Sequence, residues 1–224
     1  QTSVRGNKDL RRSSVTNVDL RVEVFPSAGE LVSASFFYKN LKDAIEQVVV
    51  TGSALGSERT FMNAELAHNY GFELEGRLGL SYVWNLLAPL SIRGNYTRVS
   101  SSVDLAGTET TIERRRRPLQ GQSPYTVNLG LGYDDPSSGF GFNLQFNRFG
   151  SHIVEVATLY EEDIVERSRN ALDVAFTQRI TQNIECKLSV RDLFAEDQVY
   201  LQGNRIARVN QRGSTVSLGV SLSY

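Results

Sequence analysis

Hydrophobic and polar residues alternate along most of the chain with a period of two residues. Val18, Leu20, Val22 and Val24, for example, are separated by polar or charged residues. Because successive side chains of a β-strand point to opposite faces, this pattern predicts a strand with one apolar and one polar face. The same alternation recurs near residues 31–50, 70–82, 90–97, 125–133, 140–147, 172–180, 184–191 and 216–224. The sequence therefore predicts an all-β protein of about nine antiparallel strands.

The connections between these strands alternate in length. Short turns are predicted near residues 26–29, 84–89, 134–139 and 181–183, and long polar loops near residues 52–63, 101–117, 151–167 and 194–213. Outer-membrane barrels have this arrangement, with tight periplasmic turns and long extracellular loops. A soluble β-sandwich, the alternative, favours strands of ~5–6 residues and has no reason to alternate its loops. The alternation thus predicts transmembrane strands, the last of which runs toward the periplasm.

Aromatic residues cluster beside the predicted periplasmic strand ends, where an interfacial girdle would anchor a barrel. Aromatic side chains also favour strands in general, which is the plainer explanation. The residues concerned are Phe25, Tyr82, Trp84, Tyr133, Phe140 and Tyr224.

Composition changes this picture little. The chain has 224 residues, a formal net charge of -1 and 40% hydrophobic residues, and a mean hydropathy of -0.27. These values are typical of a soluble protein, but only alternate residues of a barrel strand face lipid, so its mean hydropathy stays low. The near-zero charge argues against a nucleic-acid partner. The first residues lack the apolar region of a signal peptide. An exported protein needs such a signal, so we expect that the natural N-terminus lies upstream of Gln1.

Residues for catalysis or metal binding are scarce. Cys186 is the single cysteine, and His68 and His152 are the two histidines, so we expect no catalytic residues, no cofactor and no metal. The basic run at residues 114–117 could pair with lipopolysaccharide phosphates or acidic loop residues, or be a solvated loop end. The acidic run at residues 161–163 is expected to be a solvated loop, although it could attract a cation.

Two sets of residues resemble known sequence patterns, one a terminal signal and the other a protein family. Ser217, Gly219, Leu222 and Tyr224 resemble the terminal signal that the barrel assembly machinery reads, with Tyr in place of the usual Phe. Residues 36–40 (FFYKN), 117–125 (RPLQGQSPY) and 190–194 (VRDLF) resemble the C-terminal barrel of TonB-dependent receptors, particularly those of Bacteroidetes. Asp192 stands where that family usually has Asn. This resemblance extends over nearly the whole chain.

The resemblance implies the last nine strands of a 22-stranded, plugged barrel. Residues 1–224 would be its C-terminal portion, without the N-terminal plug and first strands, and either a fragment or a chain that a partner completes. It implies TonB-coupled uptake of a siderophore, cobalamin, glycan or peptide across the Gram-negative outer membrane, without enzymatic activity. The implied partners are outer-membrane lipid or lipopolysaccharide, the assembly machinery, and TonB through the plug. A passive porin-like barrel and a soluble β-sandwich binding module remain the alternatives.

In the barrel hypothesis, the polar face of the strands lines the lumen. We expect paired carboxylates such as Glu73 and Glu75 to contact water or the plug there, not to act as a catalytic acid and base. The predicted lumen-facing residues are Asp19, Arg21, Glu23, Glu73, Glu75, Arg77, Arg93, Asn95, Asn128, Asn143, Gln145, Asp173, Arg179, Glu185, Lys187 and Arg191.

Overall fold

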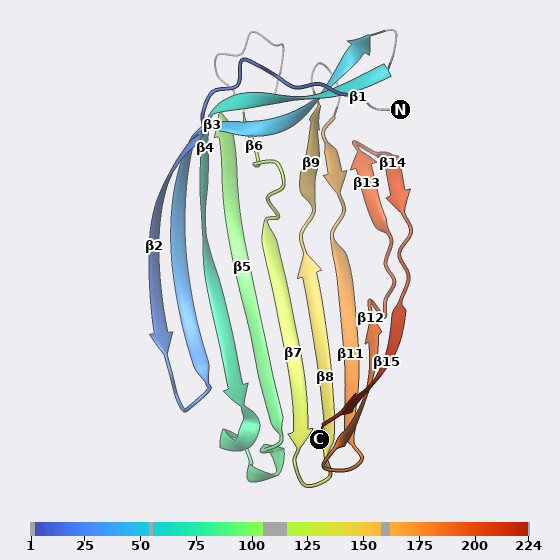
Figure 1. Ribbon diagram of the computed structural model, residues 1–224. Helices are drawn as coiled ribbons and strands as arrows, with labels where there is room; N and C mark the ends of the chain where they lie inside the picture. Colours follow the sequence, from blue (N-terminus) through green and yellow to red (C-terminus); the bar gives the residue numbers. More distant parts are fainter. Residues whose placement is uncertain (1–2, 54–55, 105–115, 158–161, 224) are drawn as a thin grey trace.

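Long antiparallel strands follow one another around a curved sheet. The computed structural model describes residues 3–53, 56–104, 116–157 and 162–223. Within them, each long strand pairs with the next in the chain. These strands are β2 (Ser14–Val24), β3 (Leu31–Ser53), β4 (Gly56–Gly79), β5 (Leu90–Asp104), β7 (Tyr125–Asp135), β8 (Phe140–Phe149), β11 (Arg169–Arg179), β12 (Ile184–Arg191) and β15 (Thr215–Leu222). Figure 1 shows a wall that curves from β2 to β15 and stays open between them, so the predicted all-β, partial-barrel architecture is confirmed.

The two ends of the wall differ. Short turns join the strands at one end, and the long connections emerge at the other (Figure 1). These connections contain strands of their own: β9 (His152–Ala157), β10 (Ile164–Glu166), β13 (Gln198–Gln202) and β14 (Arg205–Asn210). β9 joins β3 in parallel through Val48 and Val49. We call this the loop end, and it corresponds to the extracellular side in the assignment from loop lengths.

Two further short strands also lie at the loop end. β1 (Ser3–Val4) pairs in parallel with β4, and β6 (Arg116–Arg117) pairs with β5. The segment that follows β1 extends the contact with β4, because the backbone N–H of Arg5 donates to the carbonyl oxygen of Arg59 at 2.8 Å.

The structure corrects several predicted boundaries. The loop predicted at 52–63 is wrong, because β3 and β4 continue as a ladder to the pair Ser53–Gly56. The alternation is weaker there because this part of the hairpin packs against other connections instead of separating lipid from water. The strand predicted to reach residue 82 ends at Gly79, and the 3₁₀ turns Leu80–Tyr82 and Asn85–Leu87 follow. The other long loops contain the short strands named above.

Buried apolar residues gather at the loop end. One cluster contains Ala44, Ala64, Ala67 and Val103, and a second contains Val48, Ile153 and Val156. The wall itself is a single layer, so nothing in the described structure covers its apolar face. The side chains of that face are accordingly exposed, for example Leu129 at 53% and Leu218 at 75%. No helix of the described residues is long and apolar enough to cross a membrane.

Candidate functional site

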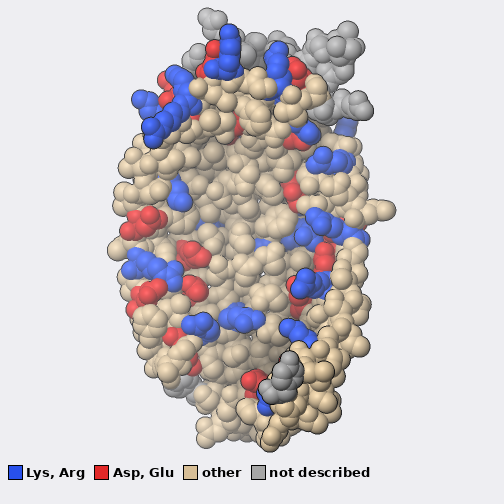
Figure 2. Space-filling view, viewed as in Figure 1, with Lys and Arg blue, Asp and Glu red and all other residues tan. Residues whose placement is uncertain are grey.

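The predicted lumen-facing residues lie on one face of the wall. Residues that pair directly across an antiparallel ladder share a face, and the ladder pairs Glu75 with Asn95, Asn95 with Asn128, and Arg179 with Glu185. Figure 2 shows this hollowed face, on which acidic and basic side chains are interspersed. The remaining predicted residues are in register on the same face through the pairs Arg21–Ser35, Glu23–Ser33, Glu73–Ser35, Arg77–Arg93, Gly132–Asn143, Asp173–Gln145, Lys187–Gly219 and Arg191–Thr215.

A chain of amide hydrogen bonds crosses four strands of this face. Asn95 Nδ2 donates to Glu73 Oε1 at 2.9 Å. Asn128 Nδ2 donates to Asn95 Oδ1, and Asn147 Nδ2 donates to Asn128 Oδ1, each at 2.6 Å. Asn95 and Asn128 thus each donate to one neighbour and accept from the other, and Asn147 donates at the far end, which orients the row. The Glu73 carboxylate terminates this row on β4.

Charged residues extend the polar face on both sides of the amide row. The Arg21 guanidinium donates to Glu23 at 2.5 Å and to Glu75 at 2.8 Å, and so joins β2 to β4. Arg93 donates to Asn143 Oδ1 at 3.0 Å. Asp19 shares the face of Arg21 and Glu23 by strand alternation, and its ladder partner is Phe37. Exposed ion pairs of this kind contribute ~0–1 kcal/mol each, so their main consequence is a hydrated, mixed-charge surface.

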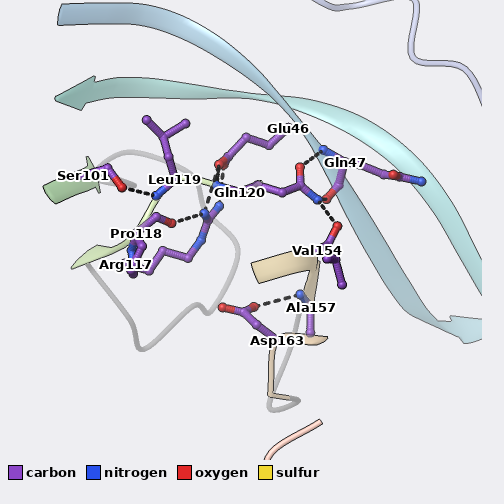
Figure 3. A network of polar contacts seen from close by, with 10 residues as sticks. All are labelled: Glu46, Gln47, Ser101, Arg117, Pro118, Leu119, Gln120, Val154, Ala157 and Asp163. Carbon is purple, nitrogen blue, oxygen red and sulfur yellow. Dashed lines mark hydrogen bonds and ion pairs between the residues drawn. The ribbon is translucent and has the colours of Figure 1, made fainter. Parts of the chain in front are cut away.

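At the loop end, a buried ion pair joins the β5–β7 connection to the β3–β4 hairpin (Figure 3). Arg117 donates from both terminal nitrogens to the two carboxylate oxygens of Glu46. Their side chains are only 7% and 6% exposed. The bidentate geometry compensates for part of the desolvation of both charges. Arg117 is therefore not the solvated loop end considered above; it pairs with an acidic residue.

Gln120 completes this junction by joining β3 to β9 (Figure 3). Its backbone N–H donates to Glu46 Oε1 at 3.2 Å. Its side-chain Oε1 accepts from the Gln47 backbone N–H at 2.7 Å, and its Nε2 donates to the carbonyl oxygens of Gln47 and Val154. The neighbouring Gly121 N–H donates to the Ile153 carbonyl oxygen at 2.7 Å. The segment from Arg117 to Gly121 thus fixes β3, β6 and β9 to one another.

The sequence pattern did not predict that Glu46 and Gln120 belong to this junction. A pairing between residues more than 70 positions apart leaves no local pattern, and the RPLQGQSPY resemblance was the signal available. Arg114, Arg115 and Glu161 lie outside the described residues. Asp163 accepts a hydrogen bond from the Ala157 N–H at 3.0 Å, so this acidic residue contacts the end of β9.

The remaining candidate residues are placed as follows. Within the described residues, no group of three His, Cys, Asp or Glu side chains could hold a metal. Tyr38 hydroxyl contacts His68 Nδ1 at 2.9 Å, and Cys186 is a half-buried free thiol. Ser217, Gly219 and Leu222 of the proposed assembly signal lie on β15, opposite Ser189, Lys187 and Ile184, whereas Tyr224 lies outside the described residues.

Comparison with known proteins identifies the family of this chain. Residues 1–193 match the family described as TonB dependent receptor-like, beta-barrel. The search of curated proteins gives no significant match.

Several solved structures share the fold. One is a ferric enterobactin receptor variant (PfeA) of Pseudomonas aeruginosa in complex with enterobactin, at 16% identity and a TM-score of 0.66, covering 99% of this chain and 33% of that one. The FrpB iron transporter of Neisseria meningitidis gives 15% identity and a TM-score of 0.63, covering 98% and 32%. The copper transporter OprC gives 14% identity and a TM-score of 0.68, covering 97% and 33%. This chain spans about a third of the length of each.

Proposed function

Because this chain belongs to the TonB-dependent receptor-like β-barrel family, we propose that it forms the C-terminal part of the wall of a receptor that imports a nutrient with energy coupled through TonB. Proteins of this family are β-barrels of the Gram-negative outer membrane, which is where this chain is located. They are transporters and not enzymes, as expected from the sequence. The Bacteroidetes origin stays a prediction.

The observation that carries the proposal is the open sheet with a polar concave face. The strands β2 and β15 run in the same direction (Figure 1), so they cannot pair with each other and continue the antiparallel order. Further strands are needed to close the barrel. In the proposal, the same polypeptide supplies these strands and the plug, and the plug contacts the polar face around Glu73, Asn95 and Asn128. The plug would transmit the interaction with TonB.

The substrate belongs to the siderophore, cobalamin, glycan or peptide classes in this proposal. The loop end, fixed by Arg117, Glu46 and Gln120, would give the external connections a defined arrangement for ligand binding. The solved structures with this fold include an iron transporter, a ferric enterobactin receptor and a copper transporter. At 14–16% identity these likenesses support the fold and not a particular cargo.

Uptake measurements in isogenic strains with and without TonB would test the proposal. The complete receptor that contains this chain would be expressed in both strains and offered radiolabelled ferric siderophores, cobalamin, oligosaccharides and peptides. We expect accumulation of one class in the strain with TonB and background uptake without it. Equal uptake in both strains would instead establish the passive, porin-like alternative.

A further inference from the structure

The apolar face of the wall carries a groove of about 580 Å³ across β4, β5 and β7. Gly76 lies at its floor, and the Leu129 side chain covers its ladder partner Gly94, because a Cβ on Gly94 would lie 2.9 Å from Leu129 Cδ2. A Cβ atom added to Gly76 would meet nothing within 4 Å, so the space above this glycine is open. The large side chains that border the groove are Leu74, Leu78, Ile92, Tyr96, Leu129 and Leu131. The apolar side chains that border this groove suit contact with a hydrocarbon chain.

Two arginines border the loop-side end of this groove. Arg98 follows the groove residue Tyr96 by two positions on β5, so it shares the apolar face, and it pairs with Tyr125. Arg148 pairs with Val127, another groove residue. Its Nε donates to the Tyr125 hydroxyl at 3.1 Å. Arg98 and Arg148 therefore lie on the two strands that flank β7 at Tyr125, at the loop-side end of the apolar groove.

Along the barrel axis, these arginines lie at the level expected for the outer membrane–water interface. Tyr125 and Tyr133 terminate the apolar face of β7, with Val127, Leu129 and Leu131 between them. At ~3.4 Å per residue and a tilt of ~40°, this part of β7 rises by about 21 Å, close to the ~25 Å of a barrel's apolar band. Arg98 and Arg148, beside Tyr125, thus lie where the headgroups of the outer leaflet begin.

The described residues compensate the positive charge of these two arginines only in part. Arg98 is exposed and has no ion-pair or hydrogen-bond partner among the described residues. Arg148 is oriented by Tyr125 and by Asn170 Oδ1, at 2.7 Å. Glu196 interacts electrostatically with Arg148, but both of its oxygens already accept hydrogen bonds from Asn170. Glu196 also interacts with Arg169, so it offsets only part of the Arg148 charge.

We propose that this surface binds a phosphorylated lipid of the outer leaflet, of the lipid A class. Arg98 and Arg148 bind a phosphate group, and one acyl chain lies in the groove over Gly76. Guanidinium groups recognise phosphate through paired, charge-assisted hydrogen bonds, and the groove adds apolar contact at the distance where the acyl chains begin. The proposal rests on the orientation of the wall in the outer membrane and is independent of the transport activity.

Lipid binding by the complete purified receptor would test this site. Native mass spectrometry would compare bisphosphorylated lipid A, the same lipid after phosphate removal, and phosphatidylethanolamine. We expect the wild type to prefer the phosphorylated lipid, and the double variant Arg98→Gln, Arg148→Gln to lose about tenfold in that preference. Gly76→Leu should fill the groove and weaken binding of the lipid with and without phosphate.

Matched variants separate the site from general effects. Arg205→Gln removes an exposed cation on β14, and Gly213→Leu adds the same side chain where a Cβ also meets nothing within 4 Å. Both should bind lipid as the wild type does. Arg98→Lys keeps the charge but not the paired donors, so it should retain more of the preference than Arg98→Gln, provided that heat-modifiable gel mobility shows a folded barrel. Equal binding of both lipid A forms by the wild type, or no effect of Gly76→Leu, would overturn the proposal.

Discussion

The ion pair between Arg117 and Glu46 shows how single residues fix the loop end. Both side chains are more than nine-tenths buried, so removing one partner leaves the other charge without compensation. We expect Arg117→Ala to destabilise the folded loop end by ~3–5 kcal/mol. The change would be measured by hydrogen exchange of the backbone amides of residues 44–49.

The double replacement Glu46→Leu, Arg117→Met serves as the control for this prediction. It removes both charges and retains apolar volume, so most of the lost protection should return. Arg21→Ala, which breaks two exposed ion pairs, should cost only ~0–1 kcal/mol per pair. Comparable losses in Arg117→Ala and Arg21→Ala would show that burial does not determine the contribution of these pairs.

A second residue-scale prediction concerns two glycines of β4. A Cβ atom on Gly71 would lie 2.0 Å from the carbonyl oxygen of Arg98, whereas a Cβ on Gly76 meets nothing within 4 Å. Gly71→Ala must therefore displace the backbone of β5, and we expect it to destabilise the barrel by ~1–3 kcal/mol. Gly76→Ala should be close to neutral. Urea unfolding of the complete barrel in lipid vesicles measures both, and equal midpoints for the two variants would refute this account.

At the scale of elements, the contact between β11 and the β12–β13 connection depends on Glu196. The side chain and the backbone N–H of Asn170 each donate to this carboxylate at 2.8 Å, and they hold the pKa of Glu196 below its usual range. A carboxyl group with a lowered folded-state pKa stabilises the contact above its unfolded-state pKa, ~4.3, and that stabilisation is lost as the pH falls through the folded value.

We therefore expect protection of the Asn170 amide, corrected for intrinsic exchange, to fall as the pH is lowered below ~4. Glu196→Gln should remove this dependence, because the amide does not titrate in that range. Hydrogen exchange between pH 6 and pH 3 provides the measurement. A pH dependence that persists unchanged in Glu196→Gln would assign it to another group.

The sequence predicted the long strands well and the connections poorly, for a physical reason. A strand of the wall separates two environments, so alternation at residues 18–24 or 125–133 records which side each residue faces. The part of the β3–β4 hairpin near Glu46 and Gln47 instead packs against Gln120 and β9, and such contacts between distant segments leave no period. The polar face was predicted residue by residue from the alternation, whereas the Arg117–Glu46–Gln120 junction was not.

At the scale of the whole molecule, the two faces of the wall have different chemistry. The concave face carries the amide row from Glu73 to Asn147 and the mixed charges. The other face exposes apolar residues from β2 to β15, with Leu20 at 64% and Val220 at 60% exposed. A single layer with these two faces is stable when lipid covers one face and water or a plug covers the other. The position of a residue on the wall therefore decides which substitutions it tolerates.

Arginine substitutions at Leu129 and Asn128 test this account most directly, because the two residues are neighbours on β7 and face opposite sides. In the complete receptor, membrane assembly would be followed by heat-modifiable gel mobility and protection from protease. We expect Leu129→Arg to destabilise the inserted barrel by ~2–4 kcal/mol, because its charge would lie in lipid. Asn128→Arg should assemble as the wild type does, because its charge would lie in the lumen. Equal assembly of both variants, or a greater defect in Asn128→Arg, would contradict a transmembrane barrel with these faces.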